Sequence, residues 1–154
     1  MQSADDIITA LNLTPHPEGG HYREVHREPA PDGERGAVTS IYYLLAAGER
    51  SHWHRVLDAV EIWNFHASGG DGVGGLALSL SPDGVTSETY LLGDNLTAGQ
   101  VPQVVVPTGW WQSASLADTA RNGWVLVGCT VAPAFDFAGF EMAPPDWMPQ
   151  DWKS

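Results

Sequence analysis

The sequence predicts an all-β fold, a sandwich or a barrel, preceded by one short helix. Short segments rich in β-branched and aromatic residues follow one another along most of the chain, and Gly, Pro and Asp separate them. Strands at this spacing, with turn residues between them, are typical of β-sandwiches and β-barrels. An apolar fraction of 43% together with seven tryptophans indicates a packed core, so we expect a globular protein.

The first predicted element is a helix over residues 3–12. Ser3 and Asp6 have the spacing of a capping box, in which each side chain binds the backbone of the other residue. Ile7 and Leu11 repeat at helical spacing and give this segment an apolar stripe. We expect the stripe to pack against the β-structure that follows.

The remaining elements are strands, which occupy about residues 13–143. They share a high content of β-branched and aromatic residues and are bounded by turn formers. In chain order they are 20–27, 37–46, 50–56, 59–67, 74–81, 85–92, 103–107, 109–116, 123–132 and 136–142. Residues 144–154 form a tail broken by Pro, with two tryptophans that we expect to pack on the body or on a second subunit.

Two connections have distinct turn chemistry. Ser-Pro-Asp-Gly at 81–84 predicts a tight hairpin, because Pro presets φ and Gly accepts a positive φ. Residues 68–75 contain too much glycine to pack, and the sequence predicts a flexible loop there, at the rim of the barrel.

Length, charge and cysteine usage limit the possible functions. The 154 residues fit one domain, and a net charge of -12 repels nucleic acid and anionic lipid. The longest apolar run, 41–47, is far shorter than the roughly 18 residues of a membrane span. We therefore expect neither nucleic acid nor membrane as a partner. The N-terminus lacks the features of a secretory signal and Cys129 is the single cysteine, predicted to be buried and inert, so we expect a cytoplasmic protein.

The most informative residues are His52, His54 and Glu61, with Gln112 about fifty residues further on. Side chains at i and i+2 of a strand point to the same side of a sheet, so both histidines should face one way and a carboxylate on the next strand could meet them. Two imidazoles and a carboxylate suit a divalent first-row transition metal and leave positions open for chemistry. Gln112 would be a weak fourth ligand, because a neutral amide oxygen suits harder cations.

The same residues allow two interpretations without metal. A histidine beside a carboxylate in an apolar barrel can act as a general base, which makes His54 and Glu61 candidate catalytic residues. Alternatively, His54 and Glu61 satisfy each other in the core, since a buried charge must be paired. His16 and Glu18 lie in a loop by composition, where they could cap the mouth of the barrel, but a surface turn is the expectation we favour.

Several aromatic and polar side chains near this constellation are candidates for a ligand pocket. Strand alternation turns only part of them inward, and core packing is the expected role of most. One or two would supply a flat apolar wall for a ring-shaped ligand. The candidate ligand-binding residues are Tyr43, Trp63, His66, Trp111 and Gln112.

The order of these motifs resembles the DUF985 branch of the cupin superfamily from about Leu13 to Ala143. The motifs that carry the resemblance are Pro-His-Pro-Glu-Gly-Gly at 15–20, Ile-Tyr-Tyr-Leu-Leu at 41–45, Ser-His-Trp-His-Arg at 51–55, Glu-Ile-Trp at 61–63, Pro-Gln-Val-Val-Val-Pro at 102–107, Gly-Trp-Trp-Gln at 109–112 and the run at 127–137. The resemblance implies a double-stranded β-helix, the RmlC-like jelly-roll barrel, which is usually dimeric and has an internal pocket.

Matched to the general cupin pattern, His52, His54 and Glu61 fall where the first motif places metal ligands. Gln112 falls where the second motif usually has a histidine, which weakens a metal site. Three functions follow as expectations: an isomerase, epimerase or lyase that uses His54 and Glu61 on a small polar or sugar-like molecule, a metal-dependent cupin enzyme, or a non-catalytic binding or sensing module. For each we expect a homodimer.

Overall fold

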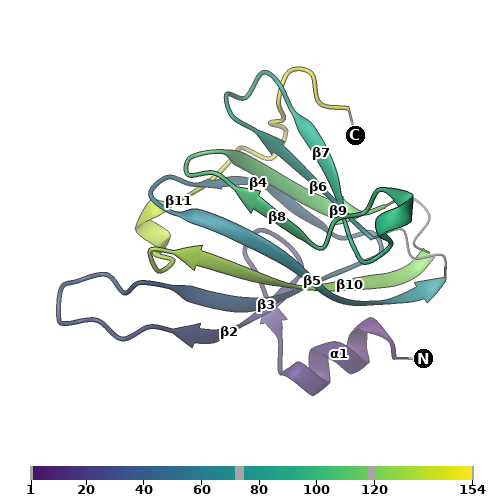
Figure 1. Cartoon of the computed structure of the whole chain (residues 1–154), viewed down its shortest axis with the longest axis horizontal. Coiled ribbons are helices and arrows are strands. Elements are labelled where there is room, and N and C mark those ends of the chain that lie inside the picture. The colour runs from purple at the N-terminus through teal and green to yellow at the C-terminus, as the bar shows by residue number, and fades with distance from the viewer. Residues whose placement is uncertain (1, 72–74, 118–120, 154) are drawn as a thin grey trace.

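The computed structural model describes residues 2–71, 75–117 and 121–153, and within them one α-helix precedes two facing antiparallel sheets (Figure 1). The sheet orders are β1-β2-β3-β10-β5-β8 and β11-β4-β9-β6-β7. The elements are α1 (Ala4–Leu11), β1 (Thr14–Pro15), β2 (His21–Arg27), β3 (Thr39–Ala46), β4 (Arg50–Val56), β5 (Val60–Asp71), β6 (Leu76–Ser81), β7 (Glu88–Leu92), β8 (Gln103–Val106), β9 (Trp111–Leu116), β10 (Arg121–Ala132) and β11 (Phe140–Met142), with 3-10 helices at Leu96–Ala98 and Phe137–Gly139.

The predicted N-terminal helix is confirmed. Ser3 and Asp6 form both hydrogen bonds of the capping box, and Asn12 closes the other end in a left-handed conformation. Ile7 is buried in an apolar cluster with Trp124 on β10. The helix therefore covers the outer face of the first sheet (Figure 1).

The strand prediction holds for most segments, and two strand starts are corrected. Strand β7 begins at Glu88 because the Asp83 carboxylate accepts hydrogen bonds from the backbone N–H groups two and three residues further on and holds them in the turn. The predicted hairpin at 81–84 does join β6 to β7. The predicted strand 136–142 begins with a 3-10 turn instead, because the Asp136 side chain caps Ala138.

The glycine-rich segment corrects another prediction. Strand β5 continues to Asp71 and pairs with β10, so residues 68–71 are not a loop. A Cβ at Gly69 would lie 2.5 Å from the Trp124 indole nitrogen. Glycine is needed there because an indole lies across the strand, not because the chain must be flexible. The rest of the predicted loop, 72–74, lies outside the described residues.

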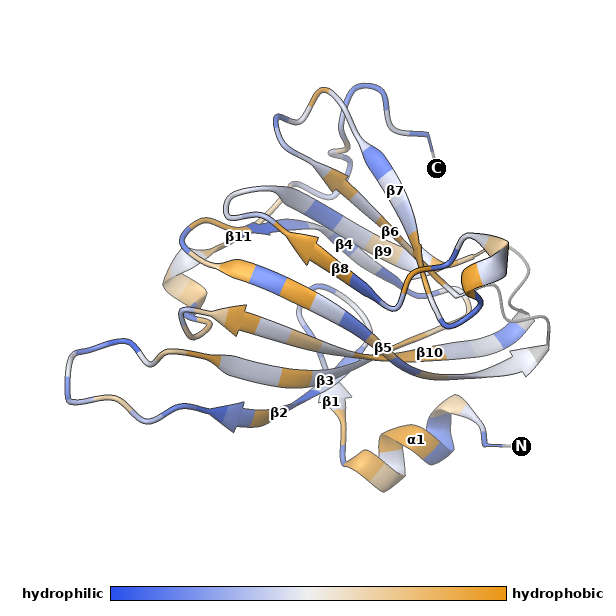
Figure 2. Cartoon of the chain, viewed as in Figure 1, coloured by the Kyte–Doolittle hydropathy of each residue, from blue (hydrophilic) through white to orange (hydrophobic). Residues whose placement is uncertain are grey.

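The apolar core lies between the two sheets, toward the end formed by β6, β7 and β9. Leu76, Leu78, Leu80 and Leu92 are almost fully buried there, and Cys129 is buried at the same core as predicted. The loop that joins β2 to β3 projects from the body and is mostly hydrophilic (Figures 1 and 2). The opposite end of the space between the sheets is left for polar side chains.

The C-terminal tail packs on the chain's own body. Trp147 and Trp152 contact Trp53 and Trp111 on the outer face of the second sheet, where these rings form an aromatic cluster. The tail tryptophans thus need no second subunit to cover them, and the homodimer stays a prediction for analytical ultracentrifugation. In the described ranges, no helix has the length and apolar character needed to cross a membrane.

Candidate functional site

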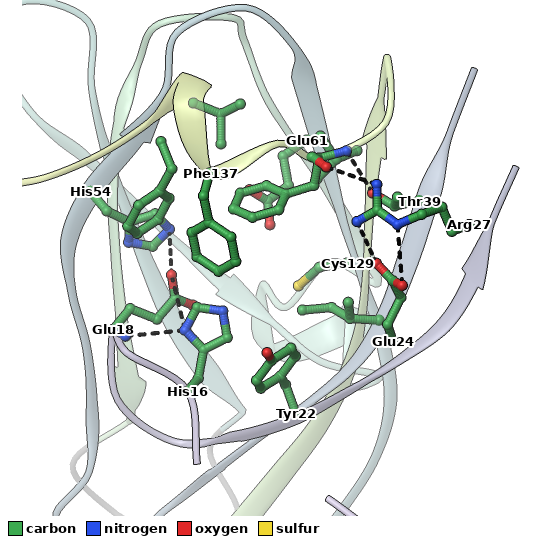
Figure 3. Close-up of a pocket in the computed structure, with 15 residues that line it drawn as sticks. His16, Glu18, Tyr22, Glu24, Arg27, Thr39, His54, Glu61, Cys129 and Phe137 are labelled. Carbon is green, nitrogen blue, oxygen red and sulfur yellow. Dashed lines mark hydrogen bonds and ion pairs between the residues drawn. The ribbon is translucent and has the colours of Figure 1, made fainter. Parts of the chain in front are cut away.

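A cavity of about 170 Å³ opens between the sheets at the end away from the leucine core (Figure 3). Strands β2, β3, β4, β5, β10 and β11 contribute to its wall, together with the turn before β2 and the segment before β11. Its polar lining consists of His16, Glu18, Glu24, Arg27, Thr39, His54 and Glu61. Its apolar and aromatic lining includes Tyr22, Ile41, Val56, Val131, Phe135, Phe137 and Phe140.

The turn between β1 and β2 carries Glu18 into this cavity. Gly19 has a φ of 111°, and a Cβ there would lie 2.0 Å from the Arg50 carbonyl oxygen, so only glycine allows this approach. The Tyr43 hydroxyl donates to the Gly19 carbonyl, and the His52 backbone N–H donates to the Glu18 carbonyl. The expected surface turn is wrong, because the turn is fixed against β3 and β4 and Glu18 is buried.

Glu18 forms a buried ion pair with His54. Glu18 Oε2 lies 2.9 Å from His54 Nε2, and the two side chains are 7% and 3% exposed. His54 Nδ1 lies 2.7 Å from the carbonyl oxygen of His52. Because a carbonyl oxygen and a carboxylate only accept, both ring nitrogens of His54 donate, and the ring is an imidazolium cation.

The pKa values agree with this charge state. Burial alone would lower the pKa of His54, but the charge and hydrogen bond of Glu18, with a contribution from Glu61, raise it to about 9. Burial would raise the pKa of Glu18, and the His54 cation outweighs that effect and lowers it. The pair is therefore charged on both sides at neutral pH.

Glu61 is oriented by a chain of two hydrogen bonds inside the core. The Trp63 indole N–H donates to Gln112 Oε1 at 2.8 Å, and Gln112 Nε2 donates to Glu61 Oε1 at 3.0 Å. An indole can only donate, so it fixes the amide with its oxygen toward Trp63 and its NH₂ group toward Glu61. One oxygen of Glu61 is thus held by Gln112, while the side chain lines the cavity.

Burial raises the pKa of Glu61 to about 7, against the opposing effect of the nearby His54 cation. The negative charge of Glu18 raises this pKa as well, while the hydrogen bond from Gln112 lowers it. Glu61 therefore exchanges a proton near neutral pH, which an ordinary carboxyl group does not do.

His16 adds a neutral hydrogen-bond donor to the cavity wall. Its Nδ1 accepts from the Glu18 backbone N–H at 3.1 Å, and burial lowers its pKa. A neutral imidazole with an accepting Nδ1 carries its proton on Nε2. Figure 3 shows the ring at the cavity wall beside Glu18.

The expectation that His52 and His54 face the same side is wrong. Strand β4 contains a register shift opposite β9: Ser51 pairs with Ala114 and His54 with Gln112, so three steps on β4 match two on β9. Such a bulge breaks the alternation of side chains. His52 instead directs its Nε2 to the backbone carbonyls at positions 143 and 144, away from the cavity.

The four side chains expected to bind a metal ion are not arranged to do so. His52 is turned away, His54 Nε2 is bound to Glu18, and the oxygen of Gln112 accepts from Trp63. Among the residues that the structure describes, no group of three or more His, Cys, Asp and Glu side chains is arranged to hold an ion. The metal-dependent interpretation therefore finds no support in the donor geometry.

None of the five predicted ligand-binding residues lines the cavity. Tyr43 and Trp63 are buried in the core, and Gln112 lies behind Glu61 as its hydrogen-bond donor. Trp111 faces the opposite side of β9 and stacks on the tail, whereas His66 is exposed on the outer face of β5 beside Tyr42. Of the predicted catalytic pair, His54 and Glu61 both reach the cavity, although the ion pair of His54 is with Glu18.

Lining residues that the sequence did not predict lie in β2, in the segment before β11 and at the first position of β11. Arg27 and Glu24 come from β2, and Phe135, Phe137 and Phe140 form an aromatic wall. The two glycines after Glu18 were a usable signal, because a double glycine permits the close approach that buries the turn. The Arg27 and phenylalanine positions carried no such signal.

The orienting role of Trp63 can be tested by substitution. Trp63→Phe removes the indole N–H and leaves the Gln112 oxygen without its donor, at a cost of about 1–3 kcal/mol. The amide is then free to turn, and the pKa of Glu61 should rise further because its stabilising donor is lost. Trp53→Phe is the matched control, since the equally buried Trp53 indole N–H has no hydrogen-bond partner among the described residues.

Urea unfolding and ¹³C NMR titration of labelled glutamate measure both effects. Equal destabilisation by the two substitutions, with an unchanged Glu61 titration, would show that Trp63 is only a packing residue.

Several solved structures have the same fold as this chain. A hypothetical protein from Leishmania major is 34% identical, with 92% of this chain and 88% of that chain covered and a TM-score of 0.80. A protein from Shewanella oneidensis is 43% identical, with 93% and 85% covered and a TM-score of 0.80. A mutant of Bacillus subtilis oxalate decarboxylase is 15% identical with a TM-score of 0.55, with 83% of this chain and 29% of that chain covered, so it shares the fold alone.

No protein of curated function matches the sequence. The family model of the cupin superfamily (DUF985) matches residues 5–143, which is most of the chain. The two facing sheets and the cupin neighbours confirm the double-stranded β-helix expected from the resemblance. The chain belongs to the Cupin_5 (DUF985) family of the cupin superfamily.

Proposed function

We propose that this protein is an enzyme that transfers a proton on a small molecule bound in the cavity, in an isomerase, epimerase or lyase reaction, with Glu61 as the general acid and base. The placement of Glu61 supports this proposal most strongly. Its buried carboxyl group lies on the cavity wall beside a buried ion pair, and Gln112 holds one of its oxygens. Burial brings its pKa to about 7. A group that titrates near the working pH is suited to take a proton from carbon and to return it.

The surrounding residues support the charge that such a reaction creates. Removing a proton next to a carbonyl group leaves negative charge on the carbonyl oxygen. The His54 cation is fixed by Glu18 and by a backbone carbonyl, so it acts through its charge and not as a base. Neutral His16 carries its proton on Nε2 at the cavity wall and supplies a hydrogen-bond donor to that oxygen.

The cavity size limits the substrate. An apolar cavity of about 150 Å³ in another protein holds a benzene molecule. The cavity here is about 170 Å³, so it suits a molecule with a single six-membered ring or a short chain. A nucleotide sugar is too large to enter whole.

The pH dependence of the reaction is predicted from the two raised pKa values. A general base must be ionised, so the rate should rise as pH passes about 7, where Glu61 loses its proton. The His54 cation is lost as pH passes about 9, and the rate should fall there. A bell-shaped profile of kcat/KM with these limbs is expected. A rate that is independent of pH between about 6 and about 10 would contradict both roles.

Exchange of carbon-bound hydrogen with solvent tests the proposal without knowledge of the product. The protein is incubated in D₂O with small aldoses, ketoses, hydroxy acids and cyclic ketones, and ¹H NMR follows the loss of individual C–H signals. We expect exchange at one carbon of at least one compound, and its loss in Glu61→Gln. Glu141→Gln is the control, because Glu141 pairs with Arg55 outside the cavity lining. Binding of a compound without exchange or turnover would identify a binding module instead.

A further inference from the structure

A second ion pair lies at the cavity, between Glu24 and Arg27 of strand β2. Arg27 Nε lies 3.2 Å from Glu24 Oε2, and Arg27 Nη2 lies 2.7 Å from Glu24 Oε1. The third nitrogen, Nη1, donates to the Phe135 carbonyl at 3.0 Å. Each of the three guanidinium nitrogens thus donates one hydrogen bond within the chain. Figure 3 shows this pair across the cavity from Glu18 and His54.

The positive groups at the cavity are paired before any ligand enters. Among the described residues that line it, the positive groups are His54 and Arg27, and each is bound to a carboxylate. His16 is neutral, and Glu61 is partly ionised at neutral pH. An entering phosphate or carboxylate therefore finds, among these residues, no unpaired cation to neutralise it, and it meets the negative charge of Glu61.

We propose that Glu24 is a specificity-determining residue: by holding Arg27 it keeps the cavity closed to anions, so that the substrate is an uncharged, hydroxyl-bearing molecule with a single ring. Tyr22, Phe137 and Phe140 supply the wall for the ring, and His16 and Glu61 supply partners for its hydroxyl groups. The inference rests on the proposed function and deepens it by naming the substrate class. It excludes sugar phosphates and other anions from the site.

The geometry of the pair explains why it would resist exchange for a ligand phosphate. A guanidinium and a carboxylate that meet through two parallel hydrogen bonds form one of the strong, charge-assisted pairings that arginine makes. A phosphate that displaced Glu24 would leave that carboxylate unpaired next to the new anion. The side chains of Arg27 and Glu24 are 48% and 41% exposed, so solvent weakens these interactions. We accordingly expect a selectivity of tens of fold, not of thousands.

The test uses inorganic phosphate and the matched pair phenol and phenyl phosphate as probes, with affinity measured by NMR titration. Glu24→Gln removes the charge that neutralises Arg27. We expect this variant to bind phosphate and phenyl phosphate at least about tenfold more tightly than the wild type, with phenol affinity unchanged. Glu28→Gln is the control: it removes a negative charge from a neighbouring exposed pair with His26 that does not line this cavity.

The double variant Glu24→Gln/Arg27→Gln should lose this gain in affinity for phosphate and phenyl phosphate, because the Arg27 cation is then absent. A wild type that binds phenyl phosphate as tightly as phenol, no gain in Glu24→Gln, or a gain that persists in the double variant would each overturn the proposal. These measurements need no turnover. If the protein selects against anions but catalyses no proton exchange, only the proposed reaction is refuted. If it catalyses proton exchange on a phosphorylated substrate, only the proposed substrate class is refuted.

Discussion

Glu61→Gln is expected to lower the rate of proton exchange about 100- to 10,000-fold, the usual contribution of a general acid or base. The substitution is close to isosteric, and the amide that replaces the carboxyl group keeps an oxygen to accept from Gln112. The loss should therefore appear in kcat, with little change in substrate affinity. NMR measurement of C–H exchange in D₂O gives the rate for both proteins under the same conditions.

Thermal and urea unfolding distinguish this catalytic role from a purely structural one, in which Glu61 only pairs with another buried group. The pKa of Glu61 is raised from 4.5 to about 7, so the folded protein binds this proton more tightly than the unfolded chain. The contribution of Glu61 to stability must then fall as pH rises from about 4.5 to about 7, by roughly 3 kcal/mol in all. Glu61→Gln lacks that loss and should be at least as stable as the wild type at about pH 8. If the variant is less stable than the wild type under these conditions but still active, then Glu61 has a structural role and not a catalytic one.

Local rules were sufficient to predict most of the fold. The capping box of the first helix, the Ser-Pro-Asp-Gly hairpin and the spacing of the strands each depend on residues close together in the sequence. The error at Gly69 has a different origin. Its glycine serves a contact with Trp124, which is distant in the sequence, and composition alone cannot separate such a contact from flexibility.

The site was predicted only in part, for a similar reason. Glu61 and His54 were identified because they lie on predicted strands, but the bulge that turns His52 away depends on the pairing of β4 with β9. Such a shift in register carries no strong sequence signal. The loop composition of its turn favours a surface position for Glu18 over a place at the mouth of the barrel. Its burial follows from long-range contacts with Tyr43 and the β4 backbone.

Glu18→Gln should cost about 3–5 kcal/mol of stability, because it leaves the buried His54 cation without its counter-ion. In the wild type, the raised pKa of His54 contributes stability that is fully present below pH 6.5 and is lost as pH rises through about 9. Without Glu18, burial dominates and the pKa of His54 falls. The variant then loses stability as pH falls below 6.5, because the unfolded chain takes up the proton more readily. The difference between the two proteins should be largest between about pH 5 and about pH 6.5 and shrink toward about pH 10.

The chain contains a matched comparison for this effect. Glu28 and His26 have the same 2.9 Å separation between nitrogen and oxygen as Glu18 and His54, but their side chains are 47% and 53% exposed. Glu28→Gln should cost less than about 1 kcal/mol, because water solvates both charges already. Urea unfolding of both variants at about pH 6 and about pH 9 makes the comparison. If Glu18→Gln costs no more than Glu28→Gln at the lower pH, then His54 is not held as a cation, and the charge that the proposed reaction requires beside Glu61 is missing.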